Sequence, residues 1–170
     1  MMNRLSIILI LFLIIAWDCS DAQIISDRYA IQNVKSDKNL RPYEAISSDG
    51  NKIVLYDHVE WKCMTWEFIQ SGENTFQLKN RFTSKTFQPS VDNVQVGTGL
   101  VQQPLRKGDN KQIWEFIETT KGVFNIRLKG TEFYISQEDA SAKTNSPIIL
   151  TRLNNSENQK WKLVKQDPVN

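Results

Sequence analysis

Short stretches in which apolar and polar side chains alternate recur along the chain in a regular order. Alternation of this kind places every second side chain on the same face of a β-strand. Three such stretches open units of similar length, at residues 29–33, 76–80 and 124–128. We predict a strand at each, with polar side chains on one face and the following apolar side chains on the buried face: Tyr29, Ile31, Phe76, Leu78, Phe124 and Ile126.

Three further strands follow each opening strand. The second strands are predicted at residues 38–42, 85–89 and 133–137, with the equivalent apolar residues Leu40, Phe87 and Ile135. The third strands are predicted at residues 52–57, 99–104 and 146–151, where Leu55, Gln103 and Leu150 each stand 11 residues before a tryptophan. That tryptophan begins the fourth strand of each unit, as Trp66, Trp114 and Trp161.

The units form a threefold internal repeat. Their tryptophans are 48 and 47 residues apart, and the units span approximately residues 27–70, 74–118 and 122–166, which we call the first, second and third repeats. A period of this size indicates a repeat architecture, and 12 short strands with intervening turns are typical of all-β sandwiches or barrels. Three repeats with no residual domain predict closure about a pseudo-threefold axis, with the three tryptophans in the core.

The first 22 residues have the layout of an export signal. Arg4 supplies the positive start, the run from Leu5 to Ala16 is apolar apart from Ser6, and small residues stand at Ser20 and Ala22. The apolar run is shorter than the roughly 20 residues of a membrane-spanning helix. We expect cleavage after Ala22, which leaves residues 23–170 as a secreted, cell-envelope or periplasmic domain that is not in the membrane.

Two other interpretations of this leader stay open. It could act as an uncleaved anchor, or Cys19 could carry a lipid, although Trp17 and Asp18 are poor residues before a lipid-attachment cysteine.

Charge and cysteine content restrict the function further. The formal net charge of +2 is too weak and too scattered to favour nucleic acid as a partner. After removal of the leader, Cys63 is the one remaining cysteine and His58 the one histidine. We therefore expect no internal disulfide, no metal or other cofactor, and no nucleophilic catalytic triad.

The repeats resemble those of a known family. The triplets Gln112-Ile113-Trp114 and Gln159-Lys160-Trp161 are similar to the QxW repeats of ricin-B-type lectins, and the resemblance extends from about residue 27 to residue 165. It implies a β-trefoil fold and a secreted, single-domain, non-enzymatic carbohydrate-binding protein. The first repeat departs from the motif, because Met64 stands where glutamine is expected.

The resemblance also implies which positions would hold sugar. Galactose-binding members use an acid after the apolar residue of the second strand, an aromatic residue at the end of the third strand, and an asparagine before the QxW glutamine. The acid positions here are Arg41, Gln88 and Ser136, the aromatic positions are Tyr56, Pro104 and Thr151, and the asparagine positions are Cys63, Lys111 and Asn158. No repeat has the full set, so the galactose-type sites are degenerate.

Two groups of residues are the sugar-binding candidates, because related lectins also take acids from the loop after the second strand. The first group, in the first repeat, combines acidic and aromatic side chains: Glu44, Tyr56, Asp57, His58 and Trp61. The second, in the third repeat, contains Asp139, Asn158 and Gln159. The alternative interpretation of the first group is that Tyr56 covers the core and Trp61 packs on a neighbouring loop.

Two functions follow from these observations. The first is carbohydrate binding, with monosaccharide or oligosaccharide glycans as partners. The second is a trefoil that binds another protein through its loops, for instance as a protease inhibitor, because loops rather than the fold determine function. An enzyme is not expected, since adjacent acids such as Glu138 and Asp139 in a polar loop are ordinarily solvated.

Overall fold

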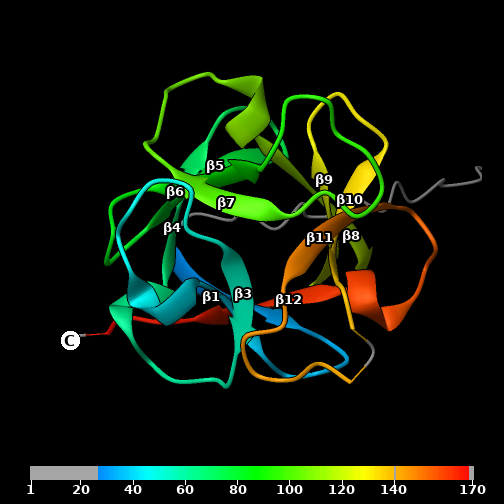
Figure 1. Cartoon of the computed structure of the whole chain (residues 1–170). Coiled ribbons are helices and arrows are strands. Elements are labelled where there is room, and N and C mark those ends of the chain that lie inside the picture. Colours follow the sequence, from blue (N-terminus) through cyan, green and yellow to red (C-terminus); the bar gives the residue numbers. More distant parts are fainter. Residues whose placement is uncertain (1–26, 140, 169–170) are drawn as a thin grey trace, which may run out of the picture.

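A computed structural model describes residues 27–139 and 141–168, so the leader at residues 1–22 lies outside the described residues. The three repeats surround the centre of the molecule as three lobes (Figure 1). Each repeat contributes four strands, as predicted. The first has β1 (Arg28–Asn33), β2 (Asn39–Pro42), β3 (Ile53–Tyr56) and β4 (Trp66–Gln70). The second has β5 (Thr75–Asn80), β6 (Thr86–Pro89), β7 (Leu100–Gln103) and β8 (Trp114–Thr120). The third has β9 (Val123–Leu128), β10 (Phe133–Gln137), β11 (Ile148–Arg152) and β12 (Trp161–Lys165).

The helical residues of the described chain lie in four single turns of 3-10 helix. One follows β2, and the other three each end two residues before a core tryptophan: η1 (Tyr43–Ala45), η2 (Lys62–Met64), η3 (Asn110–Gln112) and η4 (Glu157–Gln159). Within residues 27–139 and 141–168, no helix has the length and apolar character that a membrane crossing requires.

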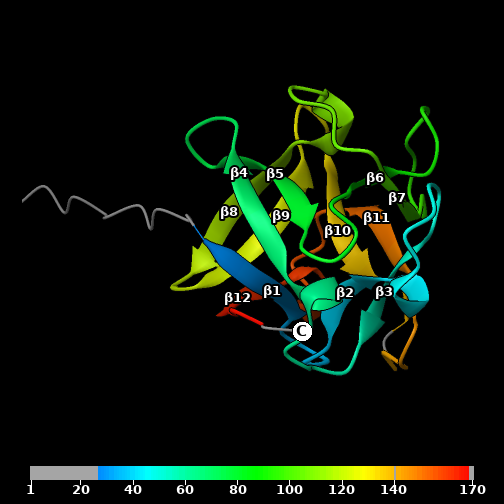
Figure 2. The same cartoon turned by 90° about the vertical axis from the view of Figure 1, so that its left-hand side faces the viewer.

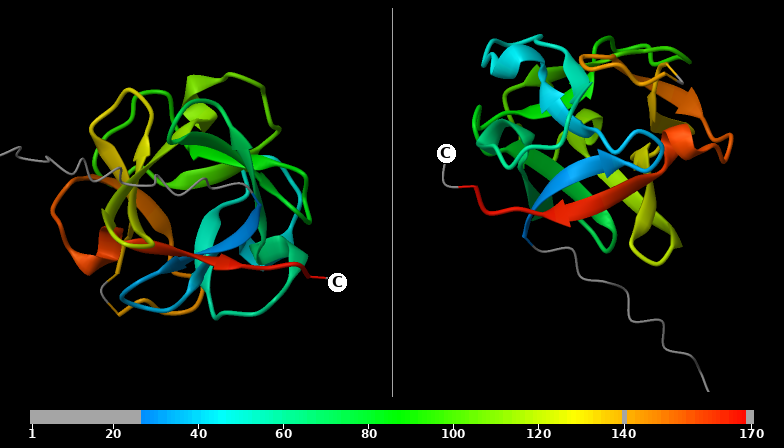
Figure 3. Two further views of the ribbon diagram at one scale, coloured as in Figure 1. Left: turned by 180° about the vertical axis from the view of Figure 1, so that it is seen from behind. Right: turned by 90° about the horizontal axis from the view of Figure 1, so that it is seen from below.

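Six strands close into a barrel. Antiparallel pairing runs from β1 to β4, β5, β8, β9 and β12, and β12 returns to β1. The closing pair, β1 and β12, brings the two ends of the described chain side by side (Figure 3). Ion pairs between Lys165 and Asp27 (2.7 Å) and between Arg28 and Asp167 (2.8 Å) join these ends.

The other six strands form three hairpins, β2–β3, β6–β7 and β10–β11, one in each repeat. In Figure 2 the barrel strands β4, β5, β8 and β9 lie toward the left, and the hairpins β2–β3 and β6–β7 lie toward the right. A six-stranded barrel with one hairpin from each of three repeats is a β-trefoil, so the predicted fold class is confirmed.

The hairpins contact one another in a cycle. In each repeat, a backbone N–H of the third strand donates a hydrogen bond to a backbone carbonyl in a loop of another repeat. These bonds are Leu55 N–H to the Ser146 carbonyl (2.9 Å), Gln102 N–H to Asn51 (2.7 Å) and Leu150 N–H to Thr98 (2.8 Å). The residue before each accepting carbonyl has a positive φ: Gly50 (78°), Gly97 (89°) and Asn145 (68°). Glycine suits this left-handed conformation and asparagine tolerates it, so the third repeat carries a side chain where the other two carry none.

These contacts correct one equivalence predicted from spacing. Gln102, not Gln103, occupies the place of Leu55 and Leu150, because Gln102 pairs with Phe87 across the hairpin and makes the contact between repeats. The second repeat therefore has one extra residue between this position and its tryptophan. The extra residue is absorbed in the exposed loop that follows β7.

The three tryptophans are fully buried and lie in one core cluster. The indole N–H of Trp66 donates to the Leu40 carbonyl, and that of Trp161 donates to the Ile135 carbonyl, each at 3.1 Å. The indole nitrogen of Trp114 is buried without a hydrogen-bond partner. Phe87 packs between two of these rings, with centroids 5.1 Å from Trp66 and 5.0 Å from Trp114.

The polar face predicted for the opening strands is largely covered. Gln77 on β5 is 2 % exposed, because its amide donates to the Arg106 carbonyl (2.8 Å) and accepts from the Gly108 N–H (3.2 Å) of the following loop. Asn33 and Asn80, the last residues of β1 and β5, are fully buried. Each accepts backbone N–H groups of the turn that follows it, which satisfies both turns without solvent.

Candidate functional site

The QxW glutamines act within the fold. Gln159 is fully buried; its amide donates to the Thr151 hydroxyl (2.6 Å) and the Arg152 carbonyl (2.7 Å), and accepts from the Asn154 N–H (2.9 Å). Gln112 is also fully buried and bonds the chain in the same way. Both amide N–H groups of Gln159 and its oxygen thus have partners inside the protein, and this predicted sugar ligand has no exposed surface.

In the second repeat, the side chains at the equivalent positions are held in contacts within the repeat. The side-chain oxygen of Gln88 accepts from Gln112 (2.9 Å), and the Lys111 ammonium pairs with Asp92 (2.7 Å). The Lys111 hydrogen bond holds the pKa of Asp92 below its ordinary value. The one-residue shift also places Gln103, not Pro104, at the aromatic position. This repeat therefore presents neither an aromatic ring nor an unpaired acid at these positions.

The third-repeat candidates are separated by their own contacts. Asn158 accepts a hydrogen bond from the buried Gln137 amide at 3.1 Å. Asp139 accepts from the backbone N–H of Ser141 (2.9 Å) and from its hydroxyl, and these bonds lower the pKa of Asp139. Among the described residues, no hydrogen bond joins Asp139 to Asn158. Asp139 is exposed, but its carboxylate is hydrogen-bonded to Ser141 within its own loop.

The first repeat brings aromatic and charged side chains together beside β3. The rings of Tyr56 and Trp61 have centroids 6.2 Å apart and planes inclined by 32°. Trp61 is 42 % exposed, so its ring packs against Tyr56 and still faces solvent. His58 is exposed, and its Nδ1 lies 2.7 Å from the amide nitrogen of buried Asn39. These residues share one face because β2 and β3 pair Asn39 directly with Tyr56.

Asp57 links the first repeat to the third. Its carboxylate pairs with the Lys38 ammonium and accepts from the Thr144 hydroxyl at 2.7 Å. The Lys38 contact first, and the Thr144 hydrogen bond second, lower the pKa of Asp57. The carboxylate therefore stays ionised at neutral pH, and the side chain, which follows Tyr56 in the sequence, is 62 % exposed.

Glu44 lies apart from the other first-repeat candidates. It is exposed in η1, beyond the Pro42 end of β2, whereas Tyr56 pairs with Asn39 at the opposite end. The β2–β3 hairpin therefore separates Glu44 from the aromatic pair.

Arg41 is the site residue that sequence reasoning did not include among the candidates. Its guanidinium carbon lies 3.5 Å from the centroid of the Tyr56 ring, so it covers one face of that ring. The guanidinium also donates to the Asn145 side-chain oxygen at 3.4 Å. The signal was present in the sequence, because Arg41 is a cation at the family's acid position.

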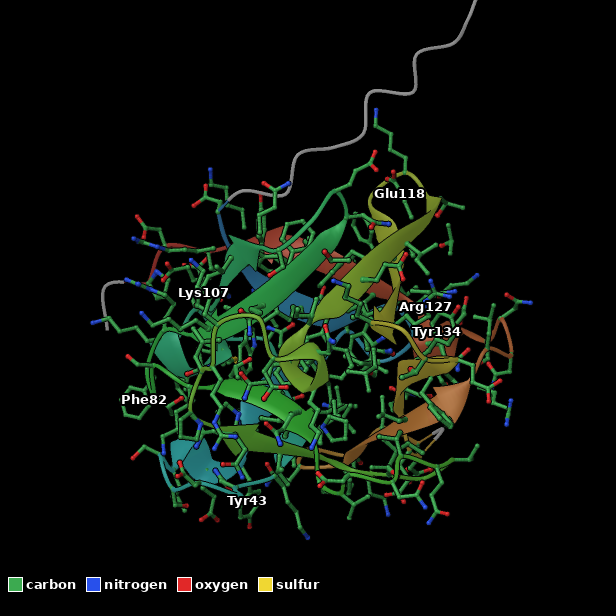
Figure 4. All side chains as sticks on the ribbon, turned by 90° about the horizontal axis from the view of Figure 1, so that it is seen from above. Tyr43, Phe82, Lys107, Glu118, Arg127 and Tyr134 are labelled. Atoms are coloured by element: carbon green, nitrogen blue, oxygen red, sulfur yellow. The ribbon has the colours of Figure 1, made fainter. Side chains whose placement is uncertain are left out.

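A hollow of about 610 Å³ lies beside the β2–β3 hairpin, toward the end at which Pro42 pairs with Ile53. Its lining includes Tyr43, Asn51, Lys52, Val54 and Asn145. Tyr43 lies at the edge of the molecule away from the β8–β9 hairpin that carries Glu118 (Figure 4). The hollow therefore opens on the hairpin end of the molecule, not on the far end of the barrel.

The described side chains favour no metal centre. Within residues 27–139 and 141–168, no three His, Cys, Asp or Glu side chains gather as a metal ion would require. Cys63 is buried as a free thiol, and its burial raises the thiol pKa above the ordinary value. It is therefore protonated at neutral pH and unsuited to act as a nucleophile.

Solved structures of similar fold include a designed protein and natural lectins. The designed three-fold symmetric protein ThreeFoil matches with a TM-score of 0.77 and 21% identity, over 81% of this chain and 98% of that one. The Rhizoctonia solani agglutinin matches with a TM-score of 0.73 and 19% identity, over 83% and 96%. The Macrolepiota procera ricin B-like lectin matches with a TM-score of 0.69 and 18% identity, over 84% and 99%.

These TM-scores show that the chain shares the fold of these proteins. Among curated protein sequences, none matches this chain significantly. The family model described as ricin-type beta-trefoil lectin domain-like matches residues 62–151, which is more than half of the chain. With the barrel, the three hairpins and the QxW glutamines in place, the protein belongs to the ricin-type β-trefoil lectin domain-like family.

Proposed function

We propose that this protein is a secreted, non-enzymatic carbohydrate-binding protein whose principal site is the first repeat. One observation carries the proposal: Trp61 keeps 42 % of its surface exposed while it packs against Tyr56, next to an ionised Asp57. An exposed indole offers an apolar face for a sugar ring, and a carboxylate accepts hydrogen bonds from sugar hydroxyls. His58 adds a group that can donate or accept at the rim.

The family relationship supports a carbohydrate ligand. The Macrolepiota procera lectin was solved in complex with lactose, and the earthworm R-type lectin C-half in complex with GalNAc. The neutralised positions of the second repeat and the internal contacts of Asp139 and Asn158 favour a single working site. A single shallow site of this kind binds weakly, and useful avidity would require several chains on one surface.

A glycan array tests the proposal directly. The fluorescently labelled protein, the variant Trp61→Ala and the control Phe82→Ala are applied to the same array. Phe82 is 57 % exposed on the β5–β6 turn, so the control removes an exposed aromatic ring away from the site. We expect Trp61→Ala to lose binding and Phe82→Ala to retain it. Absence of signal with folded wild-type protein on every glycan would refute the proposal.

Secretion has its own test. N-terminal sequencing of protein recovered outside the cytoplasm should begin at Gln23 if the leader is cleaved after Ala22. A sequence beginning at Met1 would contradict cleavage.

Binding of a protein partner is the second candidate function. The loop between β6 and β7 exposes two apolar side chains, Val91 (50 %) and Val96 (59 %). Neither belongs to the core cluster of the described residues. Affinity capture from the native surroundings, with and without free sugars, separates the two functions. One stoichiometric protein partner, retained in excess sugar and lost in Val96→Ser, would favour protein binding.

A further inference from the structure

Arg41 is a buried cation without a carboxylate partner. The residue is 6 % exposed, and the nine ion pairs of the described residues do not include it. Four of the other arginines do pair with carboxylates: Arg28, Arg81, Arg127 and Arg152. Arg106, the remaining described arginine, is exposed to water. Arg41 is thus the one described arginine that has neither solvent nor an anion around it.

The contacts of Arg41 are all with neutral groups. Its guanidinium stacks on Tyr56, and its bond to the Asn145 oxygen, at 3.4 Å, is long. Its Nε is buried without a partner. The nearby Cys63 thiol is protonated, so it is no counter-ion. A guanidinium keeps its charge in proteins, and a buried charge is unfavourable unless it is paired.

An unpaired acceptor lies on the same face of β2. Asn39 and Arg41 are two residues apart on this strand, so their side chains project to the same side. The amide nitrogen of Asn39 contacts His58, but its buried side-chain oxygen has no partner. The interior beside this face therefore holds an unpaired donor, Nε of Arg41, and an unpaired acceptor, Oδ1 of Asn39.

The hollow described above lies beside Arg41. Val54, which pairs with Arg41 across the β2–β3 ladder, and Asn145, which accepts its hydrogen bond, both line the hollow. Lys52 is the one charged residue of its lining. Its ammonium is a positive charge, in addition to Arg41, that favours an anion in the hollow.

The corresponding positions of the other repeats are neutral and internally bonded. Gln88 accepts from Gln112, and the Ser136 hydroxyl donates to the Gln137 carbonyl at 3.1 Å. In the first repeat Met64 replaces the QxW glutamine and is fully buried, so no amide is available there to bond Arg41.

We propose that the first repeat selects sugars that carry an anionic group, either a carboxylate or a sulfate. Arg41 binds the anionic group in place of the Asn145 oxygen, and the exposed ring of Trp61 supports the ligand at the rim. This inference rests on the proposed sugar-binding function and specifies its ligand class.

Isothermal titration of the full chain tests the selectivity with three probes: methyl β-galactoside, galacturonic acid and galactose 6-sulfate. The variants are Arg41→Gln and the matched control Arg152→Gln, which removes one exposed positive charge elsewhere. For the wild type and the control, we expect at least one acidic sugar to bind about tenfold or more tightly than the neutral sugar, as a charge-assisted hydrogen bond provides. In Arg41→Gln the three affinities should become equal. The two acidic probes show whether the site prefers a carboxylate or a sulfate.

A second variant keeps the test decisive if Arg41→Gln fails to fold. Asn145→Gly preserves the left-handed backbone and removes the internal competitor for the guanidinium. We expect it to raise the affinity for the preferred acidic sugar several-fold and to leave the neutral sugar unchanged. Equal affinities in the wild type, or an acid preference that survives in Arg41→Gln, would overturn the inference alone. Failure of all three probes and of every arrayed glycan to bind would overturn the sugar-binding function as well.

Discussion

Replacement of each core tryptophan by phenylalanine separates the hydrogen bond of the indole from its packing. Trp66→Phe and Trp161→Phe each remove a donor from a buried carbonyl, that of Leu40 and that of Ile135. Leu55, opposite Leu40 in the hairpin, bonds to the third repeat, so it cannot supply the missing donor. Trp114→Phe removes an indole N–H that has no partner.

The expected magnitudes follow from this difference. All three changes remove the same volume from fully buried sites, so the cavity cost is broadly shared. The loss of a buried hydrogen bond that leaves its acceptor unpaired adds about 1–3 kcal/mol to Trp66→Phe and Trp161→Phe. Removal of an unpaired buried N–H adds no such cost to Trp114→Phe. We therefore expect Trp114→Phe to be the least destabilising of the three.

Urea unfolding followed by far-ultraviolet circular dichroism measures the three free energies of unfolding without relying on tryptophan fluorescence. For a domain of this size, each kcal/mol corresponds to about 2–4 °C in Tm, so thermal melts provide a second reading. An unchanged m-value is the control that the unfolded states are comparable. If Trp114→Phe proves as destabilising as the other two variants, the assigned roles of the indole hydrogen bonds are wrong.

Three further changes test other contacts. Gln159→Leu should lower the free energy of unfolding by at least about 1–3 kcal/mol in urea titrations, because it leaves three partners unpaired, and it should leave sugar binding by the first repeat unchanged. Asn145→Ala should be about 1–2 kcal/mol less stable than Asn145→Gly in the same titrations, because a Cβ is unfavourable at this positive φ. The pKa of Asp57 is lowered in the folded protein, so this carboxylate adds stability above its unfolded pKa of about 3.9 that is lost as the pH falls through the lower, folded value. Asp57→Asn should thus reduce the loss of stability between pH 6 and pH 3, and an identical pH dependence in both proteins would contradict this role.

The repeat was readable from the sequence because large apolar residues recur at positions that the barrel needs. Each tryptophan begins a barrel strand and is fully buried in the core cluster in all three repeats, so spacing alone was sufficient to predict the strands. The prediction failed by one residue at Gln103 because the loop after β7 is longer, and an exposed loop accepts an insertion at little cost. Burial of Gln77 could not be read either, because it depends on a loop that folds back over the barrel.

The candidate site was less predictable because its chemistry depends on pairs from different repeats. Asp57 was identified as an acid, but its contact with Thr144 joins residues 87 positions apart. Gln159 carried the family motif, yet both its amide N–H groups and its oxygen are bonded inside the protein. Arg41 was noted as a departure from the acid position, while its contact with Tyr56 required knowledge of the strand register. Residue type showed which groups were present, and only the fold showed which were already in use.

The pairing of β1 with β12 also sets an order of events during synthesis. Until residues 161–165 leave the ribosome, β12 is missing, and β1 and β9 each lack the barrel strand with which they pair on that side. A nascent chain with only two repeats also lacks β9, so its open strand edges are those of β1 and β8, and such edges are templates for pairing with other chains. We expect a chain with this topology to complete its barrel only after its last strand has been made.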